Sequence, residues 1–216
     1  MEFDLQIVNH HFPSLSGSQQ RRLERFSELV ADWNEKVNLI SRNDVQNLPI
    51  RHILHSLAIA KTVDFQPGTR ILDVGTGGGF PGIPLAILYP ECQFLLIDSI
   101  GKKIRAVSDC IDSLGLENTK ARQVRANAVE DTFDFVVARA VTQLPKFLQW
   151  IQGSIRGPSL NALRNGVLYL KGGNLEEEFA SLNEKPTLYP INNYFNYPEF
   201  ENKFVVHVPL NSKKKS

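Results

Sequence analysis

Residues 71–84, Ile71-Leu72-Asp73-Val74-Gly75-Thr76-Gly77-Gly78-Gly79-Phe80-Pro81-Gly82-Ile83-Pro84, predict a strand, a glycine-rich turn and the start of a helix. The apolar residues at the beginning suit a buried strand. The glycines permit positive φ angles and let the backbone approach a ligand closely. Pro81 presets φ for a first helical turn, where its missing N–H costs little. We therefore expect a helix N-terminus with free N–H groups beside the turn.

The spacing of the glycines distinguishes two classes of nucleotide site. A dinucleotide site uses G-x-G-x-x-G, whose third glycine serves helix–strand packing. Counted from Gly75, that position is Phe80, so the NAD pattern is not met. The alternative G-x-G-x-G is met by Gly75, Gly77 and Gly79, with Asp73 two residues ahead. This order favours S-adenosylmethionine (SAM) as the ligand, while a tight turn in an unrelated α/β protein is the alternative.

A second acidic residue supports a nucleotide-like ligand. Residues 93–97 form an apolar run that predicts a buried strand, and Asp98-Ser99 follow it directly. Asp98 lies about 20 residues after the glycine turn, the offset at which an acid accepts hydrogen bonds from ribose hydroxyls. A lone Asp at a strand end is more often a helix cap, but the glycine turn at this spacing favours the ribose role.

Several segments together resemble one protein family. Residues 75–84, GTGGGFPGIP, closely resemble the bacterial small-subunit rRNA methyltransferase G family, also called glucose-inhibited division protein B. The resemblance extends in order to WNEKVNL (33–39), RHIL (51–54), DSIGKK (98–103), ARA (138–140) and LKG (170–172). It implies a SAM-dependent enzyme that methylates N7 of a guanine in 16S rRNA. The family usually has Arg-His-x-x-Asp-Ser from residue 51 on, whereas this chain has His55 in place of the acid.

The resemblance also implies roles for individual residues. The glycine loop approaches the methionine part of SAM, Asp98 holds the ribose, and residues 129–130 flank the adenine. Phe80 packs against the methionine or the target base, or is a core aromatic. Arg139 is the catalytic candidate, positioning either the target base or the cofactor. The expected cofactor-binding residues are Gly75, Gly77, Gly79, Phe80, Asp98, Ser99, Val129, Glu130 and Arg139.

The reaction implied by the resemblance requires little acid–base chemistry. N7 of guanine carries a lone pair and no proton, so attack on a sulfonium methyl needs no general base. Catalysis is then expected to consist of proximity and in-line orientation. Two other classes of function remain open. One is a SAM enzyme acting on a different RNA, a protein or a small molecule, and the other is a non-catalytic SAM- or RNA-binding protein on the same fold.

The order of predicted elements indicates an α/β protein. We expect a Rossmann-like class I SAM-dependent methyltransferase domain at 67–216, with a mostly parallel, twisted sheet and helices on both faces. A small N-terminal helical extension, 1–66, would pack on it, with Arg51 and His52 projecting off the apolar face of its last helix. Predicted strands are 70–74, 93–97, 121–124, 133–138 and 166–170, then an antiparallel hairpin of 188–191 and 204–208; predicted helices are 81–89, 102–114, 143–155 and 174–182.

Composition limits the partners that we expect. The chain has 216 residues, 42% of them hydrophobic, and a net charge of +1. Without a secretion signal, a membrane-length apolar run or a metal-ligand spacing, we expect a cytoplasmic, metal-free protein, and a monomer. So small a net charge favours a preformed surface, the small ribosomal subunit or an assembly particle, over free RNA. Candidate RNA-binding residues are Arg51, His52, Lys102, Lys103 and Lys171.

Overall fold

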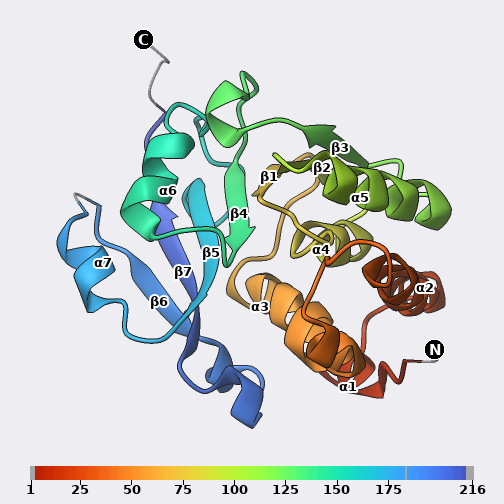
Figure 1. Ribbon diagram of the computed structural model, residues 1–216. Helices are drawn as coiled ribbons and strands as arrows, with labels where there is room; N and C mark the ends of the chain where they lie inside the picture. The colour runs from red at the N-terminus through yellow and green to blue at the C-terminus, as the bar shows by residue number, and fades with distance from the viewer. Residues whose placement is uncertain (1–2, 183, 213–216) are drawn as a thin grey trace.

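The computed structural model describes residues 3–182 and 184–212, and seven strands of this part of the chain form one sheet (Figure 1). Their order is β3-β2-β1-β4-β5-β7-β6. The first five strands pair in parallel, and β7 pairs antiparallel with both β5 and β6, which confirms the predicted parallel sheet and its closing hairpin. The strands are β1 (Arg70–Val74), β2 (Gln93–Asp98), β3 (Thr119–Gln123), β4 (Phe135–Arg139), β5 (Gly166–Gly172), β6 (Thr187–Pro190) and β7 (Lys203–Pro209).

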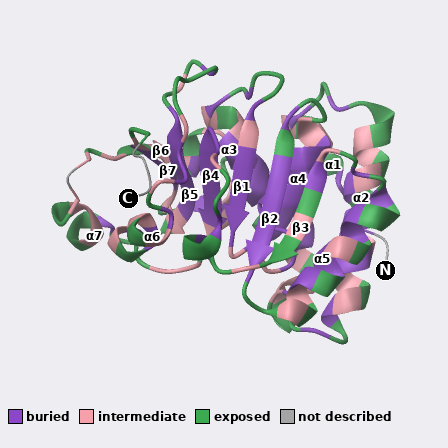
Figure 2. Ribbon diagram, turned by 90° about the horizontal axis from the view of Figure 1, so that it is seen from above, coloured by how far each residue is buried: buried purple, intermediate pink, exposed green. Residues whose placement is uncertain are grey.

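Helices cover both faces of the sheet, as predicted, and the buried residues concentrate between the layers (Figure 2). One hydrophobic cluster joins the sheet to α1 (Gln6–His11), α2 (Gly17–Asn34), α3 (His55–Thr62), α4 (Gly82–Leu88) and α5 (Gly101–Leu114). A second cluster lies on the other face, under α6 (Leu144–Trp150) and α7 (Glu176–Ala180). No helix in the described part of the chain is long and apolar enough to cross a membrane.

Alternation along the strands assigns each side chain to one of these faces. In β4, Phe135 and Val137 belong to the first cluster, whereas Val136 and Ala138 belong to the second. Continuing this alternation, Arg139 faces the same side as Phe135 and Val137. The candidate catalytic arginine therefore points towards the N-terminal helices and away from α6.

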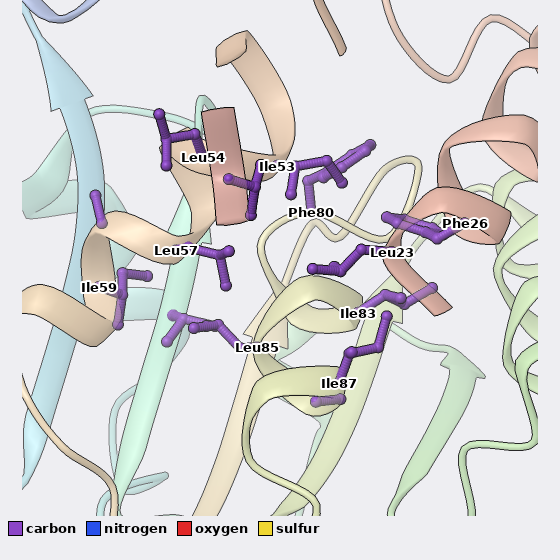
Figure 3. Close-up of a cluster of buried hydrophobic side chains, with 14 of the residues drawn as sticks. Leu23, Phe26, Ile53, Leu54, Leu57, Ile59, Phe80, Ile83, Leu85 and Ile87 are labelled. Carbon is purple, nitrogen blue, oxygen red and sulfur yellow. The ribbon is translucent and has the colours of Figure 1, made fainter. Parts of the chain in front are cut away.

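The N-terminal helices share their core with the sheet domain. Leu23 and Phe26 of α2 lie against Ile83 and Ile87 of α4 in one apolar cluster (Figure 3). At the start of α2, Ser16 and Gln19 form a capping box, in which the Gln19 N–H donates to Ser16 Oγ and the Ser16 N–H donates to Gln19 Oε1. The Gln19 amide also donates to the carbonyl oxygens of Ile87 and Leu88, which attaches α2 to the end of α4.

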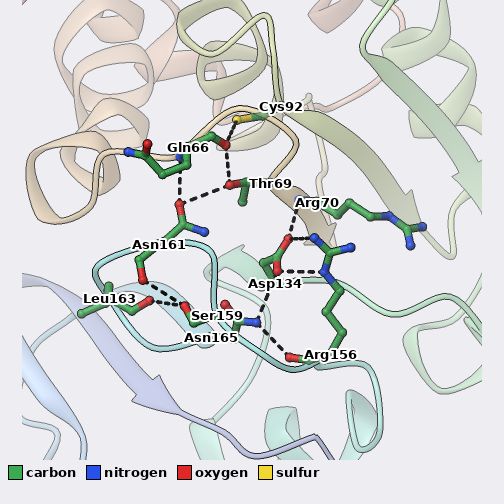
Figure 4. Close-up of polar contacts among 10 residues, drawn as sticks. All are labelled: Gln66, Thr69, Arg70, Cys92, Asp134, Arg156, Ser159, Asn161, Leu163 and Asn165. Carbon is green, nitrogen blue, oxygen red and sulfur yellow. Dashed lines mark hydrogen bonds and ion pairs between the residues drawn. The ribbon is translucent and has the colours of Figure 1, made fainter.

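A buried carboxylate lies at the edge of the sheet where the parallel strands begin, opposite the edge where they end (Figure 4). Asp134 is fully buried and accepts hydrogen bonds from the Arg70 backbone N–H and the Asn165 amide, and it pairs with Arg156 at 2.8 Å. These contacts connect the start of β1, the residue before β4 and the loop before β5. Because the charge is paired and hydrogen-bonded, its burial is compatible with a stable core.

The structure differs from the prediction most at residues 49–54. The helix expected there begins as a π-helix (Pro49–Leu54) and becomes the α-helix α3 only at His55. The wider i→i+5 turn changes the angular position of its side chains relative to the α-helix. His52 is consequently buried, with only 8% of its surface exposed, rather than projecting off the apolar face. Arg51 is exposed, as expected.

Other boundaries shift by a few residues. The helices predicted at 143–155 and 174–182 are shorter, covering Leu144–Trp150 and Glu176–Ala180. The third strand begins at Thr119 and ends at Gln123, earlier than predicted. The fourth begins at Phe135, because Phe133 makes only an isolated bridge to Ile155. At the carboxyl edge, which positions the candidate site, β1 ends at the predicted residue, and β2 and β4 each end one residue later than predicted.

Because one apolar cluster spans the N-terminal helices and the sheet, we expect both parts to unfold together. Trp33 in α2 and Trp150 in α6 are the two tryptophans of the chain and report on the two parts separately. In Trp33→Phe and Trp150→Phe variants, urea unfolding followed by fluorescence should give coincident midpoints. Adding Phe26→Ala should lower both midpoints, costing about 3–5 kcal/mol of unfolding free energy. An earlier transition at Trp33 alone would show an independent N-terminal domain.

Candidate active site at the carboxyl edge of the sheet

A cavity of about 500 Å³ lies where β1, β2 and β4 end. These strands adjoin the topological switch point of the sheet, because β1 has β2 on one side and β4 on the other. Ligands of open α/β sheets bind at this position. The cavity is lined by Val74, Gly75, Ile97, Asp98, Ser99, Ile100, Lys103, Val124, Arg125, Ala126, Asn127, Ala140, Val141 and Trp150.

The glycine loop forms one wall of this cavity with bare backbone. Gly75, Gly77 and Gly79 all have positive φ, at 69°, 59° and 92°. A Cβ on Gly75 would lie 2.7 Å from Val141 Cγ2, so a side chain at residue 75 would clash with the loop after β4. Residue 75 therefore requires glycine both for its positive φ and for the close approach of Val141. Gly77 and Gly79 belong to the same loop without lining the cavity.

Asp73 fixes the loop from beneath. Its carboxylate is fully buried, and Oδ2 accepts hydrogen bonds from Thr76 Oγ1 at 2.7 Å and from the Gly82 N–H at 2.9 Å. The first N–H of α4 is therefore not free for a ligand, contrary to the sequence expectation, because an internal carboxylate already caps it. Oδ1 has no hydrogen-bond partner among the described residues. Burial raises the pKa of Asp73 to about 7, against the lowering effect of its two hydrogen bonds.

Asp98 lies at the end of β2 and contacts both the turn before α5 and the glycine loop. Its Oδ1 accepts from the Ile100 N–H at 2.9 Å, in the turn immediately before α5. Its Oδ2 accepts from the Gly77 N–H at 3.2 Å, which connects it to the glycine loop. Asp98 and Ser99 also line the cavity. Each oxygen has a further lone pair with which it can accept a hydroxyl.

The opposite wall comes from residues that sequence reasoning did not select. Residues 124–127 follow β3 directly and line the cavity, whereas Val129 is buried in the second cluster and Glu130 is exposed. Trp150 of α6 also reaches the cavity, and no pattern in the sequence indicates this.

The loop after β4 is held in place by a buried tyrosine. Tyr169 Oη accepts from the backbone N–H groups of Val141 and Thr142 and donates to the Thr142 carbonyl, all within 3.0 Å. Ala140 in this loop has φ +53°, a conformation uncommon for residues other than glycine. Because Ala140 and Val141 line the cavity, Tyr169 supports its shape from β5.

Arg139 lies at the same edge but is not part of the cavity lining. Its Nη2 is 2.9 Å from His52 Nδ1, its Nη1 donates to the Arg51 carbonyl, and its guanidinium lies 4.9 Å from the centre of the Phe80 ring. A guanidinium only donates, so His52 Nδ1 must accept and the imidazole must be neutral. Burial, reinforced by the Arg139 charge, lowers the pKa of His52 to about 3. Burial also lowers the pKa of Arg139 to about 10, although Asp73 opposes this shift.

Phe80 and His55 both lie in the core beside this arginine. Phe80 is 1% exposed and packs between the rings of Phe26 and His52, so of the roles considered for it the structure favours the core aromatic. His55 is buried against Phe200, and burial lowers its pKa well below the usual value. His55 Nε2 has no hydrogen-bond partner in the described part of the chain.

The RNA-binding candidates differ in how available they are. Arg51 is exposed but forms an ion pair with Asp44 at 2.7 Å. Lys171 is engaged internally, pairing with Glu178 and donating to the Thr142 carbonyl. Lys102 is exposed at the start of α5, and Lys103 lines the cavity. Among residues 3–182 and 184–212, no group of three or more His, Cys, Asp and Glu side chains could hold a metal ion.

The cavity has the size and chemistry that SAM requires. Its volume falls within the roughly 300–1,000 Å³ of small-molecule sites. Apolar side chains of Val74, Ile97 and Ala126 offer a surface for a purine, and Asp98 stands beside them as an acceptor for ribose hydroxyls. Gly75 contributes backbone, without a side chain, to the same lining. The residues present therefore fit the cofactor.

Comparison with solved structures supports the Rossmann-like fold. A SAM-dependent methyltransferase from Aquifex aeolicus matches with a TM-score of 0.53 at 15% identity, over 72% of this chain and 89% of that one. Fibrillarin in its complex with Nop5p matches with a TM-score of 0.52 at 12% identity, over 71% and 79%. At such low identity these matches establish the fold alone. Fold and cavity together define a Rossmann-like, SAM-dependent methyltransferase.

The sequence comparisons identify the family. Residues 19–203 match the family model described as rRNA small subunit methyltransferase G. Proteins named ribosomal RNA small subunit methyltransferase G are 51% identical over 203 residues in Flavobacterium johnsoniae and 52% identical over 209 residues in Flavobacterium psychrophilum. These alignments cover 94% and 97% of this chain, and 97% and 100% of the relatives. The chain belongs to the rRNA small subunit methyltransferase G family, as its motifs indicated.

The raised pKa of Asp73 predicts a characteristic dependence of stability on pH. A carboxyl whose pKa is higher in the folded than in the unfolded state stabilises the fold below its unfolded pKa, and this stabilisation is lost as pH rises through about 7. Asp73→Asn removes this titration. The unfolding free energy of wild type relative to Asp73→Asn should therefore fall between pH 4 and pH 8, by up to roughly 4 kcal/mol. Urea denaturation at several pH values measures it, and a constant difference would show that Asp73 titrates normally.

Proposed function

We propose that this protein transfers the methyl group of SAM to N7 of a specific guanine in 16S rRNA, within the small ribosomal subunit or an assembly particle. The relatives' names supply the rRNA, and the position N7 comes from the motif resemblance. We propose the cytoplasm as the place of action, because the proposed substrate is found there. One chain supplies both the cavity and Arg139, so we further propose that the monomer is active.

The observation that carries this proposal is the arrangement of the two halves of the site. The cofactor cavity and the Arg139 guanidinium lie at the same edge of the sheet, with Arg139 adjacent in the chain to cavity residues Ala140 and Val141. A methyl donor in the cavity and an acceptor held by Arg139 would therefore meet at the end of β4. Because Arg139 directly precedes Ala140 in the chain, the arginine and the cavity cannot move far apart.

The protein's contribution is to bind and orient. Bound SAM supplies an electrophilic sulfonium methyl, and N7 supplies a lone pair without a proton to remove. His52 is neutral and already accepts from Arg139, so it serves as a support for the arginine rather than as a general base. Orientation of two reactants is worth up to about 7–11 kcal/mol in well-aligned cases.

Arg139 is suited to hold the guanine by an edge that does not react. Its contacts with His52 and the Arg51 carbonyl use some of its five N–H groups and leave others for a ligand. Guanine O6 is a hydrogen-bond acceptor beside N7, and arginine is its usual partner. The stacking of Arg139 on Phe80 fixes the plane of the guanidinium. We infer that Arg139 donates to O6 and thereby aligns N7.

The activity can be tested directly with small subunits from a strain that lacks this protein. The purified protein and labelled SAM should methylate those subunits, and cleavage at N7-methylguanine should map the label to one position in 16S rRNA. Subunits from the parent strain should accept almost no label, because the position is already methylated. Efficient labelling of a short naked hairpin, or of a nucleotide atom other than N7, would contradict the proposal.

Replacing Arg139 separates acceptor positioning from cofactor binding. Arg139→Ala should reduce kcat for methyl transfer by about 100-fold, the usual cost of removing one oriented hydrogen-bond donor. The Kd for SAM, measured by calorimetry, should change little because Arg139 does not line the cavity. Arg164→Ala, an exposed arginine at the other edge of the sheet, is the control. Equal losses of SAM binding and methyl transfer in Arg139→Ala would assign Arg139 to the cofactor.

A further inference from the structure

Lys203 stands at the carboxyl edge of the sheet although it comes late in the chain. It is the first residue of β7, which runs antiparallel to β5 and therefore begins where the parallel strands end. Its neighbour in register is Gly172, which has no side chain to cover it. Val205, two residues on, packs in the first cluster, so Lys203 faces the same side of the sheet as Arg139.

The surroundings of Lys203 are positively charged. Burial lowers its pKa, and the charges of Arg51 and Arg139 lower it further, with only partial opposition from Asp44 and Glu199. Asp44 is already paired with Arg51 at 2.7 Å. The neighbouring imidazoles of His52 and His55 contribute no negative charge.

Lys203 has no carboxylate of its own to balance this repulsion. Within the described residues, no Asp or Glu oxygen lies within ion-pair distance of its ammonium group, which lies 5.9 Å from the centre of the Phe200 ring. Arg139 and Val205 are both in register with Leu170, so Lys203 lies two residues nearer the carboxyl edge on the same face as Arg139. A half-buried ammonium on the same face as a guanidinium is unfavourable in the free protein. An anion bound between these positive side chains would replace their mutual repulsion with attraction to the anion.

We propose that Lys203, together with Arg51 and Arg139, forms an anion site that holds a backbone phosphate of the acceptor RNA beside the target guanine. The three groups come from three separated segments of the chain. Arg139 and Lys203 face one side of the sheet at its carboxyl edge, and the Arg51 carbonyl accepts a hydrogen bond from Arg139. The cofactor cavity is lined from the other face, by residues of the second cluster such as Val74, Ile97 and Ala126. This inference rests on the proposed function, because it takes RNA as the ligand.

The salt dependence of binding tests the phosphate contact. The Kd of the protein for small subunits from the strain lacking it should be measured over a KCl series at constant Mg²⁺. In Lys203→Met the slope of log Kd against log salt should be smaller by about one than in wild type, because one phosphate contact is lost. Lys203→Arg should keep the wild-type slope. Lys185→Met, an exposed lysine before β6, is the matched control and should also keep it.

Stability and cofactor binding distinguish this role from a structural one. Lys203→Met should have a Tm equal to or above that of wild type, since it removes an unbalanced charge, and its Kd for SAM should be unchanged. An unchanged salt slope in Lys203→Met would overturn the inference, and so would a weakened SAM affinity, which would place the cofactor's carboxylate at this cluster. If wild type fails to methylate small subunits, the proposed function itself fails, which is a separate result.

Discussion

The buried carboxylate of Asp73 is the constraint on which the site depends. Its hydrogen bonds to Thr76 and Gly82 connect the end of β1 with both the glycine loop and the first residue of α4. A Cβ on Gly82 would lie 2.7 Å from Asp73 Oδ2, so this contact also requires glycine on the helix side. The loop can remain free of side chains and still hold one shape, because its anchor lies beneath it rather than in the cavity.

The two faces of the sheet contribute different parts of the site. Residues of one face surround the cofactor cavity, and residues of the other, together with the N-terminal helices, surround Arg139. The π-helix at residues 49–54 brings His52 inward to accept from this arginine. The N-terminal segment therefore holds Arg139 in place, and in the proposed mechanism it belongs to the acceptor side of the site.

The glycine loop, the acid at the end of the second strand and the mostly parallel sheet with its closing hairpin could be predicted because their signals are local. Spacing of glycines and an acid at a strand end depend on a few neighbouring residues and on the rule that parallel strands end at one edge. Residues 124–127 and Trp150 were missed because their place in the cavity depends on where β3 stops and how α6 packs. The prediction that the N-terminus of α4 has free N–H groups was wrong, because the sequence does not reveal that the Gly82 N–H donates to Asp73.

The sequence alone determined the class of fold, the family and the likeness of the glycine loop to a SAM site. Repeating patterns and short motifs can be recognised without knowing which distant residues are in contact. Tertiary structure alone decided the partners of Arg139, the burial of His52 and Phe80, and the position of Lys203 on the same face of the sheet as Arg139. These groups are separated by many residues in the chain. Only the pairing of strands and the packing of helices brings them together, and no local pattern records that proximity.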